Sequence, residues 1–250
     1  MYRSLATAIR TLTVCPMPGK DASRLESALY FFPLVGFGLG WILYRTAILF
    51  GTGPQARWPE GTAVLLTALG LAMTRGLHLD GLSDWADGFW GGRDREHTLT
   101  IMKDSRIGSF GAAALVVALL AKWACFAELI RLGAQTWIVT AMVVSRTTQV
   151  ALAATQPYAR AEDGTGGPFI RQARIRHFLA ALGLASGLLF LWHGSDWRWI
   201  PALALGWILA RVFGLWCWHK IRGVTGDLLG AVSELSEIAL LATGIYAYNL

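Results

Sequence analysis

The sequence predicts an all-α, polytopic helical integral membrane protein, and three observations lead to this prediction. Of the 250 residues, 54% are hydrophobic and only 15% are charged, whereas a soluble domain carries about a quarter of charged residues. The 12 Trp and 28 Gly are also typical of membrane proteins, where aromatic rings gather at the interfaces and glycine is frequent within spans. Apolar runs of nearly membrane-spanning length recur along the chain, so residues 1–250 are interpreted as a single membrane-embedded domain.

The chain begins with a segment that can form a short amphipathic helix. Leu5, Ile9 and Leu12 recur at helical spacing, and Pro16 and Pro18 end the pattern.

Seven apolar runs follow this segment. They lie at about 29–50, 61–77, 110–130, 134–154, 178–193, 199–218 and 235–249. Each approaches the roughly twenty residues that a spanning helix needs, and the fifth run is the shortest. The sequence thus predicts about seven transmembrane helices.

The distribution of Lys and Arg predicts which loops share a side of the membrane. Seven spans place the N-terminus and the loops at 75–109, 155–177 and 219–234 together, and these segments contain fifteen Lys or Arg. The opposite loops contain three, which are Arg57, Arg131 and Arg198. Positive loops usually face the cytoplasm, so the polar loops are expected there. The net charge of +6 then follows from topology, and no nucleic-acid partner is expected.

The segment 75–109 contains six of the chain's sixteen acidic residues. If its first part is helical, Asp80, Asp84 and Asp87 lie at i, i+4 and i+7 and share one face. Three carboxylates near a membrane repel each other and are costly to desolvate, and a bound divalent cation would resolve both problems. Oxygen donors suit Mg²⁺ or Mn²⁺, and Mg²⁺ usually arrives with substrate phosphates. The alternative is a solvated acidic helix end, which the large apolar residues between the acids disfavour.

Two glycine-rich stretches could approach a ligand closely. Gly91 and Gly92 follow the acidic face and have no side chain to keep a ligand away. Arg160 precedes glycines at 164, 166 and 167, whose N–H groups could bind phosphate oxygens. A flexible connector is an equal alternative for this second stretch.

Several charged residues lie within or beside the apolar runs. Asp227 and Glu234 are seven residues apart, so one helical face could hold both. Asp227 could cap the last helix or make a second metal or substrate contact, and both interpretations stay open. Arg146 lies inside a run and is expected to pair with a substrate phosphate or an aspartate. Lys122 lies nearer the end of its run, where snorkelling to the interface would explain it.

The sequence resembles the cobalamin synthase family, the adenosylcobinamide-GDP ribazoletransferases, at H-L-D-G-L-S-D-W-A-D-G-F-W-G-G-R-D-R-E and at I-M-K-D-S-R-I-G-S-F-G. The resemblance also covers Y-F-F-P-L-V-G near the start and G-V-T-G-D-L-L-G-A-V-S-E-L-S-E near the end, so it spans nearly the whole chain. One departure is that the family's Ala-Asp-Thr-Ala-Asp stretch reads S-D-W-A-D here, which keeps both acids. The other is that an Arg-Ile-Pro-like element reads V-C-P.

The resemblance implies a Mg²⁺-dependent enzyme of late cobalamin assembly in the bacterial cytoplasmic (inner) membrane. Such an enzyme joins adenosylcobinamide-GDP to α-ribazole, or α-ribazole 5′-phosphate, and releases GMP. The ribazole hydroxyl would attack the phosphoryl group attached to cobinamide. This chemistry asks for positioning and charge neutralisation rather than a covalent nucleophile. Whether the chain forms a homo-oligomer or associates with other cobalamin-assembly enzymes stays open.

These implications assign roles to individual residues. Asp80, Asp84 and Asp87 would bind the metal, and Asp104 would be a further ligand or the general base. His78 would be the general base or would supply an orienting hydrogen bond. The residues expected to contact substrate are Gly91, Gly92, Arg93, Lys103, Arg106, Arg146, Arg160, Asp227 and Glu234. Four of them, Arg93, Lys103, Arg106 and Arg146, would neutralise the diphosphate.

Two other protein classes remain as alternatives. A CDP-alcohol phosphotransferase also uses spaced aspartates at a membrane face, but its D-G-x-x-A-R pattern with a later D-x-x-x-D is absent from this sequence. A transporter would use its acids for ion coupling, and it would be expected to place some polar groups on both sides or at the midplane. Substrate flux without chemical change would indicate a transporter, whereas GMP release would exclude one.

Overall fold

The computed structural model describes residues 1–51, 58–161 and 164–248, and every regular element in these ranges is a helix. The elements are α1 (Tyr2–Leu12), η1 (Leu25–Phe31), α2 (Phe32–Gly51), α3 (Pro59–Thr74), α4 (Leu77–Gly91), α5 (Arg95–Ile101), α6 (Ser109–Leu132), α7 (Thr136–Thr155), α8 (Gly167–Ile170), α9 (Ile175–His193), η3 (Trp197–Trp199), α10 (Ile200–Ile221) and α11 (Gly226–Tyr248). Six helical stretches in the described residues are long and apolar enough to cross a membrane, and α3 with α4 forms a bent seventh candidate. The predicted fold class is confirmed.

The second predicted span ends at a sharp bend, beyond which the chain continues as a further helix. α3 ends at Thr74 and α4 begins at Leu77, and the two helix axes differ by 89°. Arg75 and Gly76 adopt positive φ angles of 52° and 66°, a conformation that ends a helix. After the bend, α4 packs against α6 and α11. The predicted loop at 75–109 is therefore wrong for residues 77–91, which form a helix packed against the bundle.

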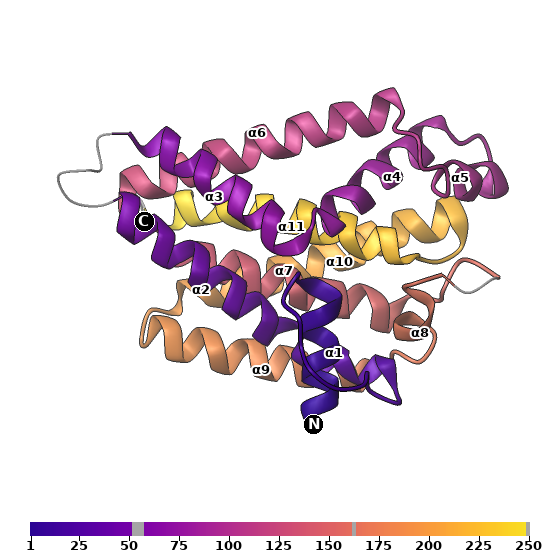
Figure 1. Cartoon of the computed structure of the whole chain (residues 1–250), viewed down its shortest axis with the longest axis horizontal. Coiled ribbons are helices and arrows are strands. Elements are labelled where there is room, and N and C mark those ends of the chain that lie inside the picture. The colour runs from indigo at the N-terminus through magenta and orange to yellow at the C-terminus, as the bar shows by residue number, and fades with distance from the viewer. Residues whose placement is uncertain (52–57, 162–163, 249–250) are drawn as a thin grey trace.

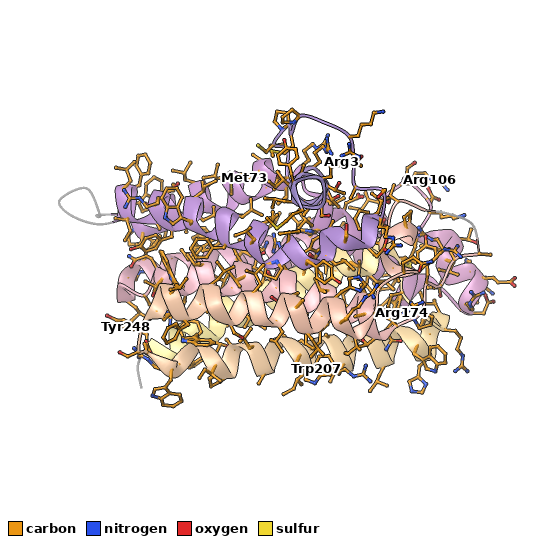
Figure 2. All side chains as sticks on the ribbon, turned by 90° about the horizontal axis from the view of Figure 1, so that it is seen from below. Arg3, Met73, Arg106, Arg174, Trp207 and Tyr248 are labelled. Carbon is orange, nitrogen blue, oxygen red and sulfur yellow. The ribbon has the colours of Figure 1, made fainter. Side chains whose placement is uncertain are left out.

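The long helices run along one axis, and their connections divide between its two ends (Figure 1). One end carries the α6–α7 and α9–α10 turns and the end of α11, whereas the other carries α5, α8 and the α10–α11 turn. Arg106 and Arg174 lie at the second end and Tyr248 lies at the first (Figure 2). This division agrees with the predicted separation of polar loops from short opposite loops. Arg57, one of the three cations assigned to the opposite loops, lies outside the described residues.

α1 crosses the long axis of the bundle, since it stands upright in Figure 1 and is seen end-on in Figure 2. Ala8 and Leu12 are buried in the core while Tyr2 is exposed, which confirms the amphipathic helix. The Val14 N–H donates a hydrogen bond to the Met73 carbonyl at 2.8 Å. This bond ties the chain after α1 to the bend between α3 and α4.

The prediction of a loop at 219–234 is wrong for most of that range, because α11 begins at Gly226. The Thr225 hydroxyl accepts a hydrogen bond from the Leu228 N–H at 3.4 Å, so Thr225 takes the capping role considered for Asp227. Polar residues at the start of α11 lower the hydropathy of residues 226–234. These residues are nevertheless helical, because their polar groups have partners inside the bundle. Hydropathy alone therefore places the start of the last helix too late.

Candidate active site

α4 carries the predicted row of carboxylates on one helix. Its helicity from Leu77 to Gly91 confirms that Asp80, Asp84 and Asp87 share a face. Asp80 is exposed and the other two are half-buried. The apolar side chains of Leu82, Trp85 and Phe89 are buried in the core. α4 is thus a packed element with one acidic face, and the solvated helix end is excluded.

α11 lies so close to α4 that it adds a fourth acid. A Cβ at Gly81 would collide with the backbone carbonyl of Asp227, and a Cβ at Gly230 would lie 3.1 Å from the His78 Cα. Glycine at both positions permits this close approach of the two helices. The negative charges of Asp227 and Asp80 consequently repel that of Asp84.

Arg160 is the cation that faces these acids. Its Nη2 donates to Asp227 Oδ2 at 2.9 Å, and its positive charge also attracts Asp84. Its Nε is buried and makes no hydrogen bond within the described residues. Arg160 therefore pairs with Asp227 and attracts Asp84, and Asp80 adds a further negative charge that acts on Asp84. A bound cation would offset the repulsion among these carboxylates. We call Asp80, Asp84, Asp227 and Arg160 the acidic junction.

The segment that carries Arg160 is held in place, which disfavours the flexible connector. The Ala159 N–H donates to the Val224 carbonyl at 2.9 Å, and the Val224 N–H donates to the Pro157 carbonyl at 2.8 Å. Arg95 adds a hydrogen bond to the Ala159 carbonyl at 2.6 Å. Sequence reasoning missed Arg95, because its partners are distant in sequence and backbone carbonyls leave no residue signature.

Asp87 contacts the start of α6 rather than the acidic junction. Its Oδ2 accepts a hydrogen bond from the Gly108 N–H at 2.7 Å, and its Oδ1 accepts one from the Gly111 N–H at 2.8 Å. These N–H groups have no partner within their own helix, and a carboxylate is favourable at a helix N-terminus. Asp87 therefore fixes α6 against α4, while its negative charge also acts on Asp84.

Asp104 and Arg106 form an ion pair on the loop between α5 and α6. Arg106 Nη2 lies 2.6 Å from Asp104 Oδ2, and the Arg106 backbone N–H also donates to this carboxylate. Hydrogen bonds from Arg106 lower the pKa of Asp104 from its ordinary value of 3.8 to about 2. So acidic a carboxyl group is a weak base at neutral pH. The predicted role of general base is therefore disfavoured for Asp104.

Two cavities adjoin the acidic junction. The larger has a volume of about 800 Å³, which is within the range of small-molecule sites. Its charged lining residues are Arg75, Asp80, Asp84, Lys103, Asp104 and Arg106. The smaller has a volume of about 240 Å³, and its polar lining includes His78, Asp80, Gln149 and Asp227. Asp80 lines both cavities, so the carboxylates stand where two ligands could meet.

The predicted contacts at the far end of α4 are not brought to either cavity. Gly91, Gly92 and Arg93 are absent from both linings, and Gly91 lies about 16 Å along the helix from Asp80. The Gly92 carbonyl accepts a hydrogen bond from Lys220 Nζ at 2.7 Å. A Cβ at Gly92 would collide with Thr98. Gly92 thus serves the packing between α4, α5 and α10.

Arg146 and Glu234 belong to a separate group of charges inside the bundle. Lys122 Nζ lies 2.6 Å from Glu234 Oε2 and 2.8 Å from Glu237 Oε1, and Arg146 Nη1 lies 2.8 Å from Glu237 Oε2. We call these four residues the buried ion cluster. The snorkelling interpretation of Lys122 is wrong, because this residue is only 8% exposed. Arg146 pairs with a glutamate, and the two cations balance the two anions.

The acidic junction has the donor chemistry of a magnesium site. No three His, Cys, Asp or Glu side chains lie close enough to hold an ion by themselves in the described parts of the chain. Mg²⁺ is usually bound through only one or two carboxylates, while waters and substrate phosphates supply its other oxygens. Asp80, Asp84 and Asp227 fit this mode of binding, since carboxylate oxygens are its preferred protein ligands.

Comparison with known proteins places the chain in a family. The family described as cobalamin-5-phosphate synthase matches residues 4–245. The chain is 50% identical to the adenosylcobinamide-GDP ribazoletransferase of Chlorobaculum parvum, across 96% of this chain and 94% of that protein. It is 40% identical to the enzyme of the same name from Syntrophobacter fumaroxidans, across 99% and 100% of the two chains. No solved structure matches it. The chain belongs to the cobalamin-5-phosphate synthase family.

Proposed function

We propose that the chain joins adenosylcobinamide-GDP to α-ribazole, or to its 5′-phosphate, and releases GMP. The observation that carries this proposal is the acidic junction, where carboxylates from α4 and α11 meet at the wall of an 800 Å³ cavity. The reaction is inferred from the names of the relatives. The carboxylates and the arginine of the acidic junction suit this reaction. Breaking a diphosphate requires neutralisation of phosphate charge and alignment of the reacting groups.

The residues of the larger cavity divide these tasks. Lys103 and Arg106 on its wall would hold the diphosphate of adenosylcobinamide-GDP. One or two of the carboxylates of Asp80, Asp84 and Asp227 would hold Mg²⁺, which would offset charge on the phosphate oxygens when bound. Arg160 would turn its unpaired Nε toward the same phosphates. The ribazole hydroxyl then forms a bond to the phosphorus attached to cobinamide and releases its proton to solvent. The bond between that phosphorus and the GMP oxygen breaks, and GMP leaves with the electron pair.

The end of the bundle that carries the acidic junction would face the cytoplasm of a bacterial inner membrane. The N-terminus and the loops at this end carry fifteen Lys or Arg, against three in the opposite loops. This is the bias that positive loops show toward the cytoplasm. Nucleotide substrates would reach the larger cavity from that side. Labelling of Cys15, the exposed cysteine near the junction end of α1, in inverted and right-side-out vesicles would test this orientation.

A transporter is the second candidate, because the 89° break between α3 and α4 resembles the interrupted helices that line transporter sites. Its acids would then couple substrate to ion movement across the membrane. The two candidates differ in outcome, since a transporter moves its substrate unchanged and a transferase makes a new bond.

The test is GMP release by purified protein in lipid nanodiscs. The assay supplies adenosylcobinamide-GDP and α-ribazole, and each is omitted in turn, with Mg²⁺ or with a chelator. The proposal expects GMP and a corrinoid of the mass of adenosylcobalamin in equal amounts, and only when both substrates and metal are present. GMP release without ribazole would indicate a hydrolase. Flux of unchanged substrate across sealed vesicles, with no GMP, would indicate a transporter.

A further inference from the structure

The smaller cavity contains features of a second binding site that the reaction chemistry above does not use. It has a volume of about 240 Å³ and lies between residues of α1, α4, α7 and α11. It shares Thr11, Leu77 and Asp80 with the larger cavity. A ligand in the smaller cavity would therefore lie next to the carboxylates of the acidic junction.

Two buried side chains of this cavity have polar atoms without partners. Gln149 and His78 are each only 2% exposed. Gln149 Nε2 donates to the Leu229 carbonyl at 3.1 Å, which leaves its Oε1 as a free acceptor. Neither Oε1 of Gln149 nor either ring nitrogen of His78 makes a hydrogen bond within the described residues. Buried polar groups are normally satisfied, so these atoms indicate a ligand with hydroxyl or amine groups.

The remaining lining indicates that the part of the ligand inside this cavity is partly apolar and carries no phosphate. Phe32, Phe169 and Leu229 supply apolar wall, and no Lys or Arg is among the residues that line this cavity. The larger cavity is lined by Arg75, Lys103 and Arg106, which suit phosphates. The larger cavity thus suits phosphate groups, and the smaller cavity suits a nucleoside. The two cavities differ in both charge and volume.

We propose that the smaller cavity binds the nucleoside acceptor, with its aromatic base against Phe32 and Phe169 and its ribose toward the acidic junction. This inference rests on the proposed function. Gln149 Oε1 accepts a hydrogen bond from a ribose hydroxyl, and His78 makes a second hydrogen bond to the nucleoside. The attacking hydroxyl then lies beside Asp80, the carboxylate that lines both cavities. Gln149 is a binding residue for the acceptor and has no contact with the corrinoid substrate.

The main test is Gln149→Leu, which keeps the volume of the side chain and removes the acceptor. We expect the KM for α-ribazole to rise at least about tenfold, because the bound ribose hydroxyl would lose its hydrogen-bond acceptor. The KM for adenosylcobinamide-GDP stays within about twofold of its original value, because Gln149 does not line the larger cavity. The KM for α-ribazole 5′-phosphate rises by the same factor as that for α-ribazole, because both share the nucleoside.

Gln135→Leu is the matched control. Gln135 is also a buried glutamine, 4% exposed, and its Nε2 donates to the Ile130 carbonyl at 3.4 Å. It lies about 21 Å from Gln149 along α7 and lines neither cavity. Its substitution should leave both KM values unchanged. Thr165→Phe is a second variant for the site, because Thr165 is exposed at the cavity wall and a larger ring there obstructs entry without disturbing the core.

Equilibrium binding of α-ribazole to the protein in nanodiscs separates this inference from the proposed function. Binding that Gln149→Leu and Thr165→Phe weaken, in a protein that releases no GMP, would support the cavity and overturn the transferase. Normal GMP release with unchanged ribazole KM in both variants would overturn the cavity and leave the transferase intact. Absence of α-ribazole binding to the unaltered protein would overturn both.

Discussion

Two groups of charged residues on α11 differ in how their charges are compensated. Near its start, Asp227 belongs to the acidic junction, where Arg160 pairs with Asp227 and two further carboxylates lie beside two cavities. Two to three turns further along, Glu234 and Glu237 pair with Lys122 and Arg146 in a closed cluster. The junction adjoins cavities of about 800 and 240 Å³, whereas the charges of the cluster balance and line a cavity of only about 20 Å³. We therefore assign a role in binding and catalysis to the acidic junction, and a role in stability to the buried ion cluster.

The largest effect is expected at the buried ion cluster. Glu237→Gln breaks contacts with both Lys122 and Arg146 and leaves cationic charge buried without compensation. This should lower the free energy of unfolding by about 3–5 kcal/mol, measured by denaturation in detergent. The rate of GMP release per folded molecule should stay within about twofold. A stable, folded Glu237→Gln protein with no activity would show that the buried ion cluster takes part in the reaction. It would contradict the purely structural role given to the cluster.

A control for this prediction removes a complete ion pair. Lys122→Met with Glu234→Leu deletes one cation and one anion and keeps the contact between Arg146 and Glu237. Replacement of a buried pair by apolar residues is often nearly neutral. The double variant should therefore unfold at a higher denaturant concentration than Glu237→Gln.

The opposite response is expected at the acidic junction. Asp84→Asn removes one of several carboxylate charges that repel one another. The melting temperature should therefore be unchanged or slightly raised. GMP release should fall at least about 100-fold, because a preorganised group that offsets or holds charge is lost. Kinetics and thermal unfolding on the same preparation check both statements. Near-normal turnover would remove the metal assignment from Asp84.

A smaller effect is expected at Asp87, which shares the acidic face but contacts α6. Asp87→Asn replaces an acceptor oxygen that binds the Gly108 or Gly111 N–H. The loss should resemble that of a helix cap, about 1 kcal/mol of unfolding free energy. GMP release should fall by much less than in Asp84→Asn. Equal losses of activity in the two variants would return Asp87 to the metal site.

The smallest effect is expected at Arg93. This residue is exposed and lies beyond the end of α4, away from both cavities. Arg93→Gln should change kcat/KM by less than about twofold, whereas Arg106→Gln at the larger cavity should raise the KM for adenosylcobinamide-GDP. A larger loss from Arg93→Gln would indicate that the substrate reaches beyond the larger cavity.

Local sequence patterns predicted the fold class and the acidic face of α4, because both depend on residues near one another in the chain. Hydropathy indicated the spans, and i, i+4, i+7 spacing placed Asp80, Asp84 and Asp87 together. The bend at Arg75 and Gly76 had no comparable signal, since an exposed arginine with positive φ is uncommon.

The rest of the site depends on contacts between distant segments. The approach of α4 to α11 joins Asp227 to Asp84, and it requires glycine at positions 81 and 230. Sequence reasoning left Asp227 open between capping and binding, and it grouped Asp87 with the metal by spacing alone. It also missed Gln149, because a buried glutamine within an apolar run resembles ordinary packing until its unpaired oxygen is placed beside a cavity.

The most direct test of the acidic junction is the Mg²⁺ dependence of GMP release in Asp227→Asn and Asp87→Asn. The initial rate is measured at saturating substrates over a range of Mg²⁺ concentrations, after both variants are confirmed to be folded. We expect the Mg²⁺ concentration for half-maximal rate to rise at least about tenfold in Asp227→Asn, because one carboxylate ligand is lost. It should stay near the original value in Asp87→Asn. A reversed result, with the shift in Asp87→Asn alone, would contradict the assignment of Asp227 to the metal.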